Sequence, residues 1–130
     1  MGARGLSGPA YAGHVFWDAD VFVLPVLAAV HPPAARAMLE YRVRRLPAAR
    51  CLAAARGLEG ARFPWESAAD GTDVTPTSAP DPHGEVVAIR TGGQEEHIVA
   101  DVAWAACRYA AWSAEDDYRV RLVNAKHLAS

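Results

Sequence analysis

Two dipeptides in the sequence each place a carboxylate next to an indole: Trp17-Asp18 and Trp65-Glu66. The apolar face of a sugar ring packs on an aromatic side chain. An ionised carboxylate only accepts hydrogen bonds, so it suits the hydroxyl groups of the same sugar. The two pairs are therefore candidate carbohydrate-binding groups. A core tryptophan beside a surface acid would give the same dipeptide, and that alternative stays open for each pair taken alone.

Other residue clusters support competing chemistry less well. His97 and Asp101 have the i, i+4 spacing that could hold a metal, but the remaining histidines are scattered and no HExxH motif is present. The arginines near Arg42 share their segment with Glu40, and the chain has a formal net charge of -2. A solvated or salt-bridged face is the expectation there, without a nucleic-acid partner.

The elements that position the two pairs are expected to be mainly helices. A helix is predicted over Asp18 to Val30, bent at Pro25, and a second one starts at Pro33. Pro47 is predicted to begin a third helix, which Gly57 ends as a left-handed cap. The apolar stripe of the second helix is Ala35, Met38, Leu39, Val43 and Leu46.

The second half of the chain is expected to hold one long loop, one short strand and one helix. Residues 61–82 read as the loop and residues 85–91 as the strand, with a chain turn at Gly92-Gly93. The last helix is predicted from about Glu95 to Trp112. Its apolar stripe is Ile98, Val102, Ala105, Ala106 and Tyr109.

Four blocks, in order along the chain, resemble glycoside hydrolase family 65. They are GHVFWDADVFVLP at residues 13–25, YRVRRLPAAR at 41–50, FPWESAADGTDVTP at 63–76 and GEVVAIRTGGQEEHIVADVAWA at 84–105. The resemblance implies an (α/α)6 barrel, a ring of six helical hairpins. It also implies inverting chemistry on α-linked glucose disaccharides of the maltose, trehalose or kojibiose type, with inorganic phosphate or water as the nucleophile.

The resemblance also assigns residues to the sugar pocket. Trp17 and Asp18 match the positions that hold the donor-side glucose, and Trp65 and Glu66 match a loop near the acceptor side. His97 and Gln94 match positions close to the pocket. The implied partners are the disaccharide and phosphate, with no other cofactor, and a homodimer is a further expectation for the full-length enzyme.

One departure from the family pattern limits what is expected of these residues alone. The family's proton donor is a glutamate in a Gly-Pro-Asp-Glu-Tyr-His-like stretch, and no such stretch occurs in this sequence. An inverting reaction needs an acid and an opposed nucleophile, so the chain alone is expected to be inactive. Three hypotheses remain: part of an α-glucoside phosphorylase, part of a trehalase-like hydrolase, or a non-catalytic helical fragment or pseudogene product.

Composition sets the remaining expectations. The longest apolar stretch, Val21 to Val30, is shorter than the roughly 20 residues needed to span a bilayer, and no export signal is recognised. No membrane partner and a cytoplasmic location are therefore expected. The single lysine and single asparagine, Lys126 and Asn124, both lie in the last seven residues of an otherwise arginine-rich chain. Residues 1–112 are thus expected to be a fragment of the family barrel, and residues 113–130 a non-native or frameshifted tail.

Overall fold

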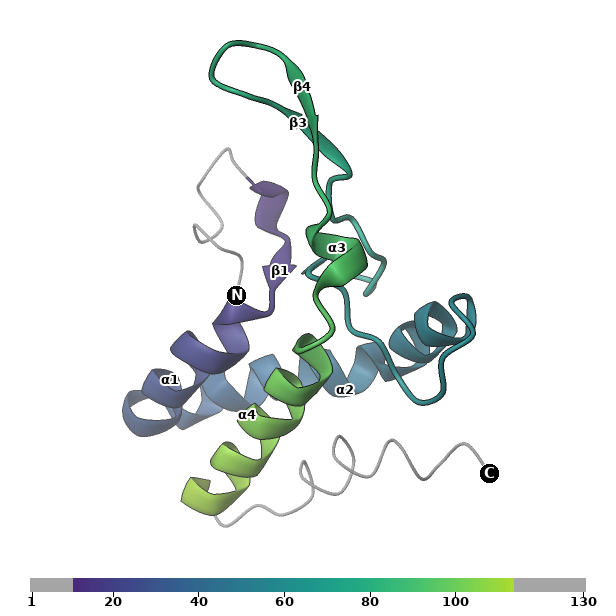
Figure 1. Cartoon of the computed structure of the whole chain (residues 1–130). Helices are drawn as coiled ribbons and strands as arrows, with labels where there is room; N and C mark the ends of the chain where they lie inside the picture. The colour runs from purple at the N-terminus through teal and green to yellow at the C-terminus, as the bar shows by residue number, and fades with distance from the viewer. Residues whose placement is uncertain (1–10, 114–130) are drawn as a thin grey trace.

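A computed structural model of the chain describes residues 11–113, and this part is mainly helical. Figure 1 shows the helices α1 (Leu24–Val30), α2 (Pro32–Ala54) and α4 (Ile98–Ser113) lying together, with a β-hairpin projecting away from them. Of the predicted tail at residues 113–130, all but Ser113 lies outside the described residues. Among residues 11–113, no helix has the length and apolar character needed to cross a membrane.

The predicted first helix forms, but in two parts. Residues Ala19–Val23 make a π-helix, η2, and α1 follows directly with Pro25 in its first turn. Proline is tolerated there because the first N–H groups of a helix have no partner within it. Before η2, the chain forms a short 3-10 turn η1 (Tyr11–Gly13) and a two-residue strand β1 (Val15–Phe16).

The prediction that a third helix starts at Pro47 is wrong. Helix α2 runs through Pro47 without a break, although proline lacks the N–H that this position would donate. The reason is packing: the buried face of α2 continues beyond the proline through Ala49 and Ala53, while Pro47 itself is exposed. Tertiary burial of that face outweighs the loss of one backbone hydrogen bond.

The helix end predicted at Gly57 is confirmed. Gly57 has a φ of 69°, in the left-handed region that glycine adopts without steric cost. The backbone N–H of Leu58 donates to the carbonyl of Ala53 at 3.0 Å, and that of Gly57 donates to Ala54 at 3.0 Å. These bonds reverse the chain and satisfy carbonyls that the end of α2 leaves unpaired.

The predicted long loop at residues 61–82 contains strands that sequence reasoning did not foresee. Strand β2 (Glu66–Ser67) pairs antiparallel with β1, and β3 (Ser78–Pro80) pairs antiparallel with β4 (Val86–Ala88). The strand predicted at residues 85–91 is therefore confirmed but shorter. The β3–β4 hairpin is the element that projects in Figure 1.

The glycines at 92 and 93 do not simply turn the chain. They lie in a one-turn helix, α3 (Thr91–Gln94), which connects the hairpin to α4. A Cβ on Gly92 would come within 2.9 Å of the Thr75 methyl carbon, so the close approach of these two segments requires glycine.

Helix α4 begins three residues later than predicted, and its expected apolar stripe is confirmed. All five predicted stripe residues are buried, as are the α2 stripe residues except Leu46, which is partly buried against the same core. The core cluster lies where α1, α2 and α4 meet. Its largest fully buried apolar members are Leu24, Leu39, Ile98, Val102 and Tyr109.

Candidate functional site

The two indole–carboxylate pairs meet at one cavity. Trp17, Asp18, Trp65 and Glu66 all line a cavity of about 410 Å³. The two indole rings lie with their centroids 5.6 Å apart and their planes tilted by 57°. The other lining residues are Tyr11, Phe16, Thr75, Pro76, Ile89 and Thr91. The wall of this cavity thus joins aromatic faces to two carboxylates, the mixture that a sugar ring needs.

The pairing of β1 with β2 brings the dipeptides together. Phe16 is directly opposite Glu66 in the register and Val15 is opposite Ser67, so the residues that follow and precede these positions become neighbours. The Ser67 hydroxyl donates to the carbonyl of Val15 at 3.3 Å, and the Tyr41 hydroxyl donates to Ser67 Oγ at 2.8 Å. Helix α2 therefore supports the strand pair from one side.

Glu66 is held more tightly than a surface acid would be. It is only 6% exposed, and its Oε1 lies 2.7 Å from Nδ1 of His14. Its backbone N–H donates to the Thr75 hydroxyl at 3.1 Å, and its carbonyl accepts from the N–H of Val74 at 3.0 Å. Since a carboxylate has about four acceptor positions, the fixed Glu66 retains capacity for a ligand.

Asp18 differs from Glu66 in its surroundings. It is exposed and stands immediately before η2, where it occupies the N-cap position without making a side-chain capping bond. Its oxygens remain available to hydroxyl donors in the cavity. The two acids therefore offer one exposed acceptor and one preorganised acceptor at the same sugar-sized space.

A buried ion pair underlies the segment that carries Trp17 and Asp18. Arg42 of α2 and Asp20 of η2 are 1% and 2% exposed, and both the Arg42 Nε and Nη2 groups donate to Oδ2 of Asp20, at 3.0 and 2.5 Å. The guanidinium also donates to the carbonyl of Phe16 at 3.4 Å. Arg42 is thus not part of the solvated arginine face expected from sequence; it ties the segment from β1 to η2 to the core.

His97 contacts Trp17 and is not among the residues that line the cavity. Its ring packs edge to face with Trp17, with centroids 4.5 Å apart and planes at 81°. The buried indole Nε1 of Trp17 has no hydrogen-bond acceptor within the part of the chain that the structure describes. An unpaired buried donor is costly, so an acceptor from a ligand or from further polypeptide would be favourable here.

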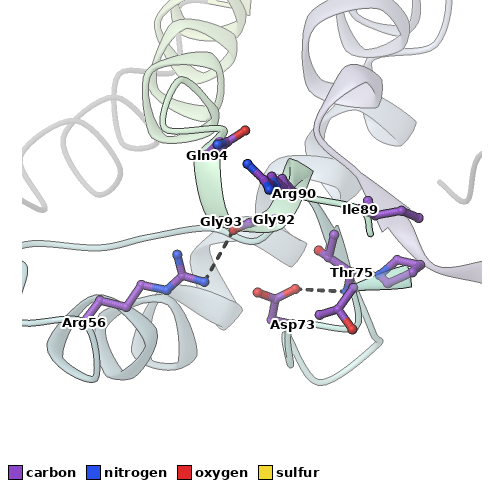
Figure 2. Close-up of a pocket in the computed structure, with 10 residues that line it drawn as sticks. Arg56, Asp73, Thr75, Ile89, Arg90, Gly92, Gly93 and Gln94 are labelled. Atoms are coloured by element: carbon purple, nitrogen blue, oxygen red, sulfur yellow. Dashed lines mark hydrogen bonds between the residues drawn. The ribbon is translucent and has the colours of Figure 1, made fainter. Parts of the chain in front are cut away.

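Gln94 is among the lining residues of a second cavity, of about 390 Å³, and not of the first. Figure 2 shows the residues that line this second cavity, including Arg56, Arg90 and Asp73. The Arg56 guanidinium donates to the carbonyl of Gly92 at 3.4 Å, and the backbone N–H of Thr75 donates to the Asp73 carboxylate at 3.0 Å. Thr75, Pro76 and Ile89 line both cavities, so the two cavities adjoin at these residues.

Comparison with known proteins decides the family. The model of the glycosyl hydrolase family 65 central catalytic domain matches residues 1–124. The chain belongs to glycosyl hydrolase family 65. A kojibiose phosphorylase of Caldanaerobacter subterraneus subsp. tengcongensis is 50% identical over 109 residues, which are 84% of this chain and 14% of that protein. A kojibiose hydrolase of Flavobacterium johnsoniae is 47% identical over 105 residues, 81% of this chain and 14% of that protein.

A third relative aligns with a longer part of this family 65 chain. The kojibiose phosphorylase of Escherichia coli strain K12 is 42% identical over 125 residues, 90% of this chain and 16% of that protein. The chain thus spans about one seventh of the length of these relatives. The relatives in this family include kojibiose phosphorylases and kojibiose hydrolases, and the resemblance to family 65 is confirmed.

Several lining residues of this family 65 chain were missed by sequence reasoning. Tyr11, Phe16, Thr75 and Thr91 line the cavity, and His14 binds Glu66. Only proximity in sequence could have pointed to them: His14 and Phe16 lie within four residues of Asp18, and Thr75 lies in the block that contains Trp65. The contacts themselves depend on the β1–β2 pairing. Strands of two residues are too short to give a recognisable sequence pattern.

Proposed function

We propose that the chain forms part of the catalytic domain of an inverting α-glucoside phosphorylase that acts on a kojibiose-type disaccharide with phosphate as the nucleophile. One observation carries the proposal: both indole–carboxylate pairs line a single cavity of about 410 Å³. The named relatives, which include kojibiose phosphorylases at 50% and 42% identity, support the choice of substrate.

The two indole–carboxylate pairs bind different sides of the disaccharide. Trp17 and Asp18 hold the donor glucose, with the indole under the ring and the exposed carboxylate accepting from its hydroxyls. Trp65 and Glu66 contact the acceptor side. The His14 contact and the backbone bonds of Glu66 preorganise this carboxylate, so its hydrogen bonds to the sugar require little reordering.

The chemistry follows from inversion at the anomeric carbon. A phosphate oxygen attacks C1 on the face opposite the leaving group, the C1–oxygen bond breaks, and the departing sugar oxygen takes a proton from an acid. The products are β-glucose 1-phosphate and glucose. Phosphate is a co-substrate and no cofactor takes part, which agrees with the family.

The acid and the phosphate site are proposed to come from polypeptide other than residues 1–130. The chain covers about one seventh of its relatives, and Glu66 is already bound to His14 and backbone-paired. In the completed domain the described helices would belong to an (α/α)6 barrel. Sugar binding without turnover is therefore expected of the chain alone.

A chimera tests the proposal. Residues 11–113 would replace the matching segment of the Caldanaerobacter kojibiose phosphorylase, and kojibiose would be supplied with and without inorganic phosphate. The expected result is phosphate-dependent release of β-glucose 1-phosphate. Asp18→Ala in the same chimera should lower kcat/KM about 100-fold, because it removes a charge-assisted contact to the sugar, worth about 3 kcal/mol. A folded chimera without activity towards any α-linked glucose disaccharide would refute the proposal.

A hydrolase is the second candidate, favoured by the 47% identity to a kojibiose hydrolase. The nucleophile then is water, and the residues of this chain keep the same sugar-binding roles. To separate the two, the complete natural gene that encodes this sequence would be expressed, since the chimera inherits the nucleophile site of its host. Glucose release independent of phosphate would favour the hydrolase, and no turnover by a folded protein would favour a non-catalytic role.

A further inference from the structure

His97 lies between two carboxylates at the start of α4. Its Nδ1 is 2.5 Å from Oδ2 of Asp101, and its Nε2 is 2.8 Å from Oε2 of Glu95. Carboxylate oxygens only accept hydrogen bonds, so both ring nitrogens must donate. The geometry therefore fits an imidazolium, and the hydrogen bond to Asp101 raises the pKa of His97 above its usual value of 6.5, with a smaller contribution from Glu95.

The imidazole ring of His97 contacts one residue that lines the cavity, Trp17. It packs at 81° on Trp17 with centroids 4.5 Å apart, and Trp17 in turn lies 5.6 Å from Trp65. The 81° angle fits an imidazolium edge directed at the indole face, an arrangement in which the ring electrons attract the cation. Trp17 lines the cavity while His97 does not, so any effect of His97 on a sugar passes through the position of the Trp17 ring.

We propose that Asp101 is a positioning residue for the sugar cavity: it orients the His97 imidazolium, which fixes the indole of Trp17. Asp101 is in the first turn of α4, one helical turn from His97, and its backbone N–H donates to the His97 carbonyl at 3.0 Å. The backbone of the residue that binds His97 is thereby fixed by the hydrogen bonding of the first turn of α4. The link to sugar binding rests on the proposed function, whereas the link from Asp101 to Trp17 does not.

The first arm of the test needs no sugar. Nitrogen-15 labelled chain would be titrated from pH 5 to pH 9, and the indole N–H signals assigned by Trp→Phe variants. The Trp17 signal should shift with the same midpoint as the His97 ring signals, above pH 6.5. Asp101→Asn should lower that midpoint, whereas Glu59→Gln, which removes one charge from an exposed position outside the cluster, should leave it unchanged. A Trp17 signal that ignores the titration of His97 would overturn the proposal.

The second arm measures glucose affinity and asks whether Asp101 acts through His97. Asp101→Asn should weaken binding by about two- to fivefold, the size expected for a partly exposed cation–indole contact. In a His97→Gln background, Asp101→Asn should cause no further loss. An equal loss in both backgrounds would overturn the proposal. If the parent chain binds no glucose at all, the proposed function fails, and the first arm alone decides the link to Trp17. Far-UV circular dichroism checks that each variant is folded.

Discussion

Replacing Arg42 by methionine should destabilise the chain more than any exposed arginine substitution. The guanidinium and the Asp20 carboxylate are almost fully buried, and Arg42 makes two hydrogen bonds to Asp20 and one to the carbonyl of Phe16. Arg42→Met leaves Asp20 as a buried acid without its cation. Removing one partner of such a pair typically costs about 3–5 kcal/mol.

Urea unfolding measures this expected loss of stability. With a slope of about 2 kcal/mol per molar urea, a loss of about 4 kcal/mol lowers the unfolding midpoint by about 2 M. Tryptophan fluorescence reports the transition, because Trp17 and Trp65 both pack against the core. If the parent is only marginally stable, Arg42→Met should abolish the near-UV circular dichroism signal instead.

Two further variants test whether the buried Arg42–Asp20 pair causes the loss of stability. Arg44 lies on the same helix but is exposed and reaches Glu40 only at 3.7 Å, so Arg44→Met should cost at most about 0.5 kcal/mol. The double variant Asp20→Val with Arg42→Met removes both charges and should recover most of the loss. Equal effects of Arg42→Met and Arg44→Met, or a double variant as unstable as Arg42→Met alone, would show that the buried pair is not what holds this segment.

Three other perturbations have outcomes fixed by the structure. Gly71→Ala should cost about 1–3 kcal/mol, because φ is 92° and the new Cβ would lie 2.9 Å from Arg45 Cβ; Gly57→Ala, in open space, should cost less in the same urea assay. Leu39→Ala should cost about 2–5 kcal/mol by leaving a cavity under a fully buried side chain. His97 has a raised pKa in the folded state, so its contribution to stability is complete below pH 6.5 and is lost as pH rises through the folded value. The urea midpoint of the parent should therefore fall more between pH 6 and pH 8.5 than that of His97→Gln, and identical falls would contradict this assignment.

The helices were predictable from sequence because their patterns are long. The stripes of α2 and α4 each repeat over several turns, and every predicted stripe residue except the partly buried Leu46 is buried. Arg42, which the stripe does not include, is buried as well. The continuation of α2 through Pro47 was not predictable, since a local rule favours a break there and only burial of Ala49 and Ala53 opposes it.

Four of the residues that line the candidate site were predictable from the sequence, but its other lining residues and its architecture were not. The residue types of Trp17, Asp18, Trp65 and Glu66 indicated sugar chemistry, and the structure brings all four to one cavity. The strand pairing that unites them involves two residues on each side, too few to leave a periodic signal. The partners of these residues, His14 for Glu66 and His97 for Trp17, come from contacts between distant segments.

The most direct test of the central idea is a two-dimensional NMR titration of the chain with glucose and then kojibiose. If the two indole–carboxylate pairs form one sugar cavity, the indole signals of Trp17 and Trp65 should move together, and Asp18→Ala should abolish both shifts. Asp70→Asn, an acid outside the cavity lining, serves as the matched control and should preserve them. Shifts confined to Trp104 and Trp112, or shifts that persist in Asp18→Ala, would contradict the account.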